Sequence, residues 1–372
     1  MLQEHLTYVA DPVRLEHFRA AISKVVKRGD RVADLGSGSG ILGLFCLQAG
    51  AAHVDFVDQS AMIDVARQTL TRAGLADRAS FIRGRSQQVD LPERVDVVVC
   101  DHIGYFGFDY GVVQLLQDAR RRVLKPRGTL IPGGIKLQLA AAGSARCQEL
   151  AEGWGAEGIP DEFHWLREYS VNTVHAVDLK RDELVSGPAE LGRIDFSEDQ
   201  PDFLSWTAAL RMERDGIVRG LCGWFECELA KGVWMTNSPL AEEPIRRSQA
   251  FLPINEAVRV KTGDPIRATV MARPADSVTA WIVEFEATGQ RFSHSTLQGL
   301  LLSPEDLVAA NPARVAHPSP EGRARASVLG YCDGRRTVRE IEQAMLRDHP
   351  DLFPSTAEIS RFVARVLGTD TV

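Results

Sequence analysis

Asp34-Leu35-Gly36-Ser37-Gly38-Ser39-Gly40 is the stretch that decides the fold of the first part of this chain. It begins within an expected strand, Arg31 to Leu35, and precedes a helical run, Ile41 to Ala49. Glycines allow a sharp turn and let a bulky ligand approach the backbone. A dinucleotide fingerprint would need its third glycine at position 41, where isoleucine stands. The pattern predicts a cofactor-binding turn and disfavours NAD.

A carboxylate stands where such a cofactor would present its ribose. Asp58 closes the next expected strand, His53 to Val57, and could accept hydrogen bonds from both ribose hydroxyls. The alternative is that the glycines only serve turns and that Asp58 only caps a helix. The order of strand, glycine turn, helix and acid favours the cofactor site.

Two kinds of periodicity divide the chain. Short β-branched runs alternate with helical runs up to about Leu139, which predicts an α/β sheet. The expected strands there are 31–35, 53–57, 79–82, 95–100 and 129–131, and the expected helices are 41–49, 60–73 and 110–124. From Ile135 onward, alternating segments predict a mainly antiparallel barrel or sandwich, with strands at 136–140, 221–229, 266–271 and 279–285.

The C-terminal part reads as a separate helical unit. Residues 311–320 have the composition of a linker. Beyond them, Thr337 with Glu340 and Ser355 with Glu358 have capping-box spacing. The second box is followed by apolar residues at helical spacing, so short packed helices are expected there.

Composition excludes several classes of protein. At 372 residues, two or three domains are expected. The net charge of −7 argues against a large nucleic-acid surface. The six scattered cysteines have no CxxC spacing, so we expect neither a metal site nor disulfides. With no apolar run of membrane length and no signal sequence, a cytoplasmic, bacterial-type enzyme without a membrane partner is expected.

Residues 32–45 resemble the first motif of the protein arginine methyltransferases almost position for position. Residues 11–18 are similar to the helix whose arginine holds the methionine carboxylate of S-adenosylmethionine, which points to Arg14. Residues 84–88 fall where the family contacts adenine, with Gln87 at the position of the family's acid. The resemblance implies S-adenosyl-L-methionine as cofactor. The residues expected to bind it are Arg14, Asp34, Gly36, Ser37, Gly38, Gly40, Leu42, Asp58, Gln59, Ser86, Gln87 and Asp101.

The resemblance extends over about residues 11–296 and implies an architecture. It predicts a seven-stranded, Rossmann-like class I methyltransferase domain at 1–134 and a β-barrel at 135–302. A helical dimerisation arm is expected at 159–194, and with it a homodimer. A linker at 303–324 would lead to a small module at 325–372.

The methyl-acceptor loop, residues 100–110, matches the family less closely. The family places two glutamates there. In this chain Asp101 takes the place of the first, and the second falls on Tyr110, with Asp109 one residue early. Two carboxylates orient a guanidinium, and aspartate is shorter than glutamate by about 1.5 Å, one C–C bond. The loop could therefore serve a different nucleophile, and Tyr110 could line the pocket or pack beneath the loop.

Two further acceptor-site candidates leave alternatives open. The family's active-site histidine falls near Arg246, which could hold a substrate carboxylate or pair with Asp101 or Asp109. His102 could act as a general base, because the unperturbed pKa of imidazole is near neutral. Strand alternation places its side chain on the face opposite Asp101, which favours a packing role.

Residues 326–341 resemble the helix, Asp-Gly turn and second helix of winged-helix, PqqD-like modules. Such modules hold leader peptides of ribosomally made precursors, so peptide capture is one possibility; a cap on the barrel is another. The resulting prediction is a methyltransferase acting on a guanidino nitrogen of arginine, free, in a peptide or in a natural-product intermediate. The alternatives are N- or O-methylation of another nucleophile in a small molecule or precursor peptide of biosynthesis, and a non-catalytic scaffold.

Overall fold

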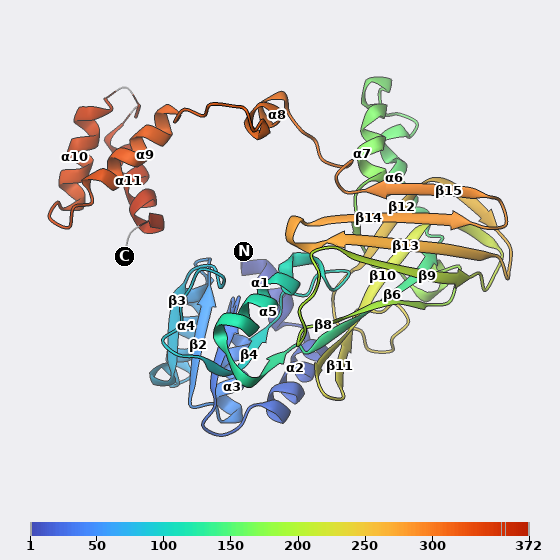
Figure 1. The fold of residues 1–372 in the computed structure, drawn as a ribbon, viewed down its shortest axis with the longest axis horizontal. Helices are drawn as coiled ribbons and strands as arrows, with labels where there is room; N and C mark the ends of the chain where they lie inside the picture. Colours follow the sequence, from blue (N-terminus) through green and yellow to red (C-terminus); the bar gives the residue numbers. More distant parts are fainter. Residues whose placement is uncertain (1, 351, 354, 371–372) are drawn as a thin grey trace. The chain divides into compact units, whose positions relative to one another are not determined.

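The computed structural model describes residues 2–350, 352–353 and 355–370 (Figure 1). The chain divides into two compact units, one ending at Leu301 and one beginning at Leu302.

A parallel five-stranded sheet forms the first layer of the larger unit (Figure 1). Its strands, in the spatial order β3-β2-β1-β4-β5, are β1 (Arg31–Leu35), β2 (His53–Asp58), β3 (Ala79–Arg83), β4 (Val95–Cys100) and β5 (Leu124–Ile131). The helices of this layer include α2 (Pro12–Val25), α3 (Ile41–Ala49), α4 (Met62–Arg72) and α5 (Val112–Asp118). The Rossmann-like order is confirmed, but the expected seven strands are five. After β5 the chain passes directly into β6 (Gly134–Ala142), which pairs within the second sheet.

The helix expected over residues 110–124 is broken into three pieces. A 3₁₀ turn, η2 (Asp109–Gly111), precedes α5, and a π-helical turn, η3 (Ala119–Val123), follows it. Tyr110 and Gly111 have φ of 72° and 75°, outside the helical region, so the α-helix begins only at Val112. Residues 125–128, which directly follow the expected helix, lie inside β5, whose pairing with β4 shifts register.

Two antiparallel sheets form the second layer, as the alternating segments predicted (Figure 1). One has the order β7-β12-β10-β6-β8, with β11 added beside β10, and the other the order β15-β14-β13-β9. The strands are β7 (His175–Val177), β8 (Ala189–Asp195), β9 (Leu204–Arg211), β10 (Gly216–Ala230), β11 (Val233–Thr236), β12 (Gln249–Val260), β13 (Pro265–Arg273), β14 (Val278–Phe285) and β15 (Gln290–Ser295). Both sheets and the parallel sheet contribute to one continuous apolar core.

The helical insertion lies earlier in the chain than expected. It consists of α6 (Ala145–Glu152), η4 (Gly153–Gly155), η5 (Asp161–Leu166) and α7 (Arg167–Val171). The rest of the arm expected at 159–194 contributes β7 and β8 to the six-stranded sheet, because its alternating apolar residues pair with β12 and β6.

The smaller unit is a helical bundle with its own core. Its helices are α8 (Pro304–Ala310), α9 (Pro320–Tyr331), α10 (Val338–Asp348) and α11 (Thr356–Asp370). The Thr337–Glu340 capping box is present. The segment expected to be a linker contains α8 and the start of α9, because Ser303 and Ser319 cap both helices. No strand occurs in the described part of this unit, so the wing of a winged helix is not seen. Among the described helices, none has the length and apolar character needed to cross a membrane.

Candidate active site

The glycine turn lies between β1 and α3, at the carboxyl edge of the parallel sheet. Gly36 and Gly38 have φ of 70° and 52°, which favours glycine at both positions. A Cβ on Gly36 would collide with the ring of His102, and one on Gly38 would lie 2.7 Å from the ring of His5. The missing side chains therefore let two imidazoles lie against the turn.

Gly40 serves packing rather than the cofactor cavity. It has φ of 82°, and a Cβ there would lie 2.9 Å from the Cβ of Ala66 on α4 and 3.3 Å from the ring of Phe56 on β2. It does not line either of the cavities described below. Its expected role in binding is thus indirect, through the close approach of α3 to its neighbours.

Two carboxylates hold the turn in place. Asp58 accepts hydrogen bonds from the backbone N–H of Gly38 at 2.8 Å and from the N–H and hydroxyl of Ser60 at 2.8 and 2.7 Å. A carboxylate has about four acceptor positions, so Asp58 can accept a further bond. Asp34 accepts from the N–H of Gly43 at 2.8 Å, and burial raises its pKa to about 7.

Two cavities meet beside this turn. The larger, of about 870 Å³, extends from the end of β2 past Gly84–Gln87 and α5 to η7 (Pro274–Asp276) of the β domain. The smaller, of about 210 Å³, lies between the turn, the N-terminal helix α1 (Leu2–Val9) and the start of the acceptor loop. Of the expected cofactor residues, all but Gly40 line one of the two cavities.

Arg14 and Asp101 form a buried ion pair in the smaller cavity. Their side chains are 7% and 8% exposed. The Arg14 guanidinium also lies 4.4 Å from the centroid of the Tyr8 ring. Burial, together with the charge of Arg247, lowers the pKa of Arg14 to about 9. The position expected to hold the methionine carboxylate and the expected acceptor acid are therefore in direct contact.

Asp109 does not line either cavity. Its carboxylate accepts hydrogen bonds from the N–H groups of Tyr105 at 2.7 Å and Phe106 at 2.9 Å, and it fills the space that a side chain on Gly104 would need. Burial raises its pKa in spite of these bonds. Asp109 thus fixes the shape of the acceptor loop, which corrects its expected place among the catalytic residues.

Tyr110, which falls at the register of the family's second acid, lines both cavities. It is 53% exposed, and its ring lies edge-on to Tyr105 with centroids 5.6 Å apart. Its positive φ is uncommon for a bulky residue.

The structure corrects the expected role of Arg246. Its side chain is exposed and does not pair with Asp101 or Asp109, while its backbone N–H donates to Asp11 at 2.7 Å. The neighbouring Arg247 lies inward. Its guanidinium donates to the carbonyl of Ile103 in the acceptor loop and lies 5.3 Å from the centroid of the Tyr8 ring.

His102 also differs from expectation. Its ring lies against Gly36 and lines both cavities rather than packing on the far face of the sheet. Its Nδ1 is 3.6 Å from the sulfur of Cys100. Burial lowers the pKa of the imidazole, Asp58 opposes this shift, and Arg247 adds to it. The strand ends at Cys100, so strand alternation does not hold at His102.

Sequence reasoning missed His5, Tyr8 and Arg247. His5 and Tyr8 are three residues apart on α1, a spacing that places them on one helix face, and this was the available signal. No signal in the sequence identifies Arg247, because two adjacent arginines in an irregular segment do not reveal which one points inward.

The comparisons with known proteins agree with this geometry. Residues 32–128 match a family model described as a methyltransferase domain. Protein arginine N-methyltransferase 1 of Schizosaccharomyces pombe is 29% identical over 286 residues, 73% of this chain and 82% of that protein. Protein arginine N-methyltransferase 6 of Xenopus laevis is 25% identical over 288 residues, 73% of this chain and 84% of that protein.

Two solved structures show the same fold. The Trypanosoma brucei PRMT1 enzyme–prozyme heterotetrameric complex with AdoHcy has a TM-score of 0.72 at 20% identity, covering 79% of this chain and 98% of that one. Arabidopsis thaliana protein arginine methyltransferase 10 has a TM-score of 0.70 at 19% identity, covering 80% of this chain and 98% of that one. The chain is an S-adenosylmethionine-dependent methyltransferase with the fold of these structures.

Proposed function

We propose that this enzyme transfers a methyl group to a guanidino nitrogen of arginine. The observation that carries the proposal is Asp101, an acid at the carboxyl end of β4 that lines the cavity beside the glycine turn. Both relatives named above are protein arginine N-methyltransferases, which supports arginine as the acceptor.

The two adjoining cavities together suit S-adenosylmethionine. The Oγ of Ser37 and the Nε of Arg14 are buried without a hydrogen-bond partner among the described residues, so polar atoms are available beside the glycine turn. In our assignment Arg14 holds the methionine carboxylate, Asp58 the ribose hydroxyls, and Ser86 with Gln87 the adenine. The bound cofactor supplies an electrophilic methyl group on a sulfonium.

The acceptor loop can orient a guanidinium with one carboxylate. Asp101 would accept from the guanidinium nitrogens and localise the charge away from the attacking nitrogen. The loop presents Tyr110 where the family has a second acid, and an aromatic ring can interact with the face of a cation. Asp109 and Arg247 act indirectly in this scheme, by holding the loop backbone and the Ile103 carbonyl.

The test is Asp101→Asn, assayed with arginine-containing peptides and mass spectrometry of the product. Turnover should fall by orders of magnitude, because a charge-assisted contact at the reacting group is lost. Calorimetry should show that affinity for S-adenosylhomocysteine is kept or increased, since Arg14 then has only the ligand carboxylate as counter-ion.

The matched control is Asp101→Glu, which keeps the charge and adds one methylene group. Its turnover should exceed that of Asp101→Asn. If the wild-type enzyme leaves arginine peptides unmodified, the assignment of the acceptor is wrong. If Asp101→Asn turns over at the wild-type rate, the acceptor acid is wrong.

We also propose a homodimer formed through the helical segment 145–171. The segment exposes Trp154, Phe163 and Trp165, which are 42%, 48% and 57% exposed. Exposed aromatic groups of this size favour burial against a partner. Within the protomer we propose residues 1–134 as the cofactor domain and 135–302 as the β domain.

The C-terminal unit is proposed to hold a peptide, as its PqqD-like sequence suggested. It contains a cavity of about 370 Å³ lined by Leu352, Phe353 and Phe362 together with charged residues. The charged residues are Glu321, Glu358, Arg361 and Arg365. An apolar floor with charges of both signs suits a peptide better than a nucleic acid. A cytoplasmic enzyme of peptide biosynthesis is consistent with this proposal.

A further inference from the structure

Methylation of arginine leaves a proton that the site must accept. A nitrogen–carbon bond forms while the donor's sulfur–carbon bond breaks with its electron pair left on sulfur. The guanidinium is a cation before and after the reaction, so the methylated nitrogen releases one proton. At a cavity next to two arginines, an unneutralised extra charge would be costly.

We infer that the Nε2 atom of His102 accepts this proton and that His102 is the general base of the reaction. The inference rests on the proposed arginine acceptor. His102 follows Asp101 directly in the chain and, like Tyr110, lines both the larger and the smaller cavity. Asp101 and His102 both line the smaller cavity, so the imidazole borders the space in which Asp101 would hold the acceptor nitrogen.

The other carboxylates near the site are less suited to the role. Asp34 is 1% exposed and accepts the backbone N–H of Gly43, so it is committed to holding α3 beside the glycine turn. Asp101 is paired with Arg14 and would also hold the acceptor guanidinium, so protonating it would remove a negative charge that lies next to two cations. Asp58 and Asp109 accept hydrogen bonds from N–H or O–H groups with both of their oxygens. Protonation of either would disrupt the turn or the loop that it holds.

The thiol and the phenol at the site are also poor acceptors at neutral pH. Burial raises the pKa of Cys100 to about 12 and, with the help of Tyr105, raises that of Tyr110. Both groups therefore already carry their protons.

The surroundings of His102 suit an imidazole that is neutral before the reaction. Burial lowers its pKa, and Arg247 in the segment before β12 acts in the same direction. Asp58 at the end of β2 raises it and could stabilise the imidazolium after transfer. His5 of α1 and Tyr110 are the other titratable groups that share both cavities with it.

Cys100 sets the tautomer in this scheme. The Nδ1 of His102 lies 3.6 Å from the Cys100 sulfur. With the Nδ1 proton directed at that sulfur, the lone pair on Nε2 remains open to accept a proton.

The first measurement is the pH dependence of the single-turnover rate in the full-length enzyme. The wild-type rate should fall about tenfold per pH unit below the pKa of His102 and level off above it. His102→Gln should lower the plateau by about 10²- to 10⁴-fold and remove this acid limb. Added imidazole should restore part of the rate of His102→Gly.

His5→Gln is the matched control, because it removes the other imidazole that lines both cavities. It should keep the acid limb, whatever its effect on cofactor affinity. A readout independent of activity is NMR of ¹⁵N-histidine-labelled enzyme. The signal missing in His102→Gln should report an Nδ1–H tautomer that titrates below pH 6.5.

Each outcome decides between the two proposals. If the wild-type enzyme does not methylate arginine peptides, the proposed function fails before His102 is tested. If it does, and His102→Gln keeps both the rate and the acid limb, the inference about His102 is overturned. An Nε2–H tautomer in the NMR spectrum would overturn it as well.

Discussion

His294 of β15 is a buried imidazole without a hydrogen-bond partner for its Nε2 among the described residues. Its ring stacks on Trp281, with centroids 5.4 Å apart, and burial lowers its pKa to about 4. An imidazole in the unfolded chain titrates near 6.5. Between these values the unfolded state binds more protons, so the free energy of unfolding should decrease as the pH falls from about 6.5 to about 4.

His294→Phe should therefore remove part of the acid sensitivity of the fold. Between pH 7 and pH 4.5, the free energy of unfolding of the wild type should fall by about 2 to 3 kcal/mol more than that of the variant. Denaturant unfolding at the two pH values measures this shift, and the value at pH 7 corrects for altered packing. A constant difference would show that His294 does not titrate in this range.

At the same scale, the sequence placed residues well where regular elements position them. Arg14 lies in the first turn of α2, Asp58 ends β2 and Asp101 directly follows β4; all three line the cavities. Residues in irregular segments were placed poorly. Arg246 and Arg247 differ by one position, and His102 lies just beyond the last residue of β4. No periodicity operates there, so only tertiary contacts decide which side chain points inward.

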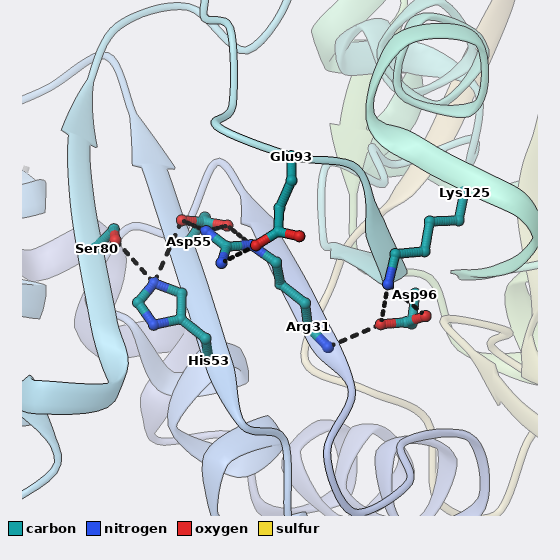
Figure 2. Close-up of polar contacts among 7 residues, drawn as sticks. All are labelled: Arg31, His53, Asp55, Ser80, Glu93, Asp96 and Lys125. Atoms are coloured by element: carbon teal, nitrogen blue, oxygen red, sulfur yellow. Dashed lines mark hydrogen bonds and ion pairs between the residues drawn. The ribbon is translucent and has the colours of Figure 1, made fainter.

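At the scale of the elements, the amino edge of the parallel sheet carries an ion network (Figure 2). Arg31 at the start of β1 forms two hydrogen bonds of 3.0 Å to the fully buried Asp55 of β2. Its backbone N–H donates to Asp96 of β4 at 3.0 Å, and Lys125 of β5 contacts the same carboxylate at 2.9 Å. The network thus joins β1, β2, β4 and β5 through residues within the first three positions of each strand.

Arg31→Met should lower the free energy of unfolding by about 3 to 5 kcal/mol, because it leaves Asp55 buried without its main cation. Combining it with Asp55→Leu should recover much of this loss, since the pair is then replaced by apolar groups. Denaturant unfolding of both variants measures the difference. If the loss in free energy of unfolding of the double variant equals the sum of the losses of the two single variants, Asp55 does not depend on Arg31 for its burial.

Sequence patterns predicted the bounds of some helices and strands but not which strands pair. The bounds 41–49 and 95–100 were predicted as they occur, because strongly apolar runs with clear ends fix them. Among the described residues the parallel sheet lacks the expected sixth and seventh strands, since the same alternating residues can pair in either sheet. The pattern identifies a strand but does not identify its partner.

At the scale of the whole molecule, we expect light scattering to give about twice the protomer mass of 40.9 kDa. Phe163→Ser with Trp165→Ala should shift the enzyme to the monomer, because it removes the exposed aromatic surface of the helical segment. Phe203→Ser is the matched control. This phenylalanine is 54% exposed but lies outside the segment, so the dimer should persist. A wild-type monomer at micromolar concentration would contradict the proposal.

The last prediction concerns the unit that begins at Leu302. Its core is built from residues of α9, α10 and α11 alone: Ala324, Val328, Ile341, Met345, Ile359, Phe362, Val363 and Val366. The larger unit has its own core and contains all of the residues that line the two active-site cavities. A chain ending at Leu301 should therefore keep its affinity for S-adenosylhomocysteine and its thermal unfolding temperature.

If the C-terminal unit holds a peptide, its loss should act on KM and not on kcat. A tethered binding unit raises the effective concentration of the acceptor without touching the reacting atoms. KM for a long precursor peptide should rise at least tenfold in the shortened chain, while a short arginine peptide that cannot reach the unit should be methylated with unchanged kinetics. Phe362→Ser in the full chain is unsuitable as a substitute, because Phe362 also belongs to the core. Arg361→Ala, at the rim of the same cavity, should reproduce part of the KM effect in a folded unit. Equal KM values for the long peptide in the full and shortened chains would show that the C-terminal unit does not bind the substrate.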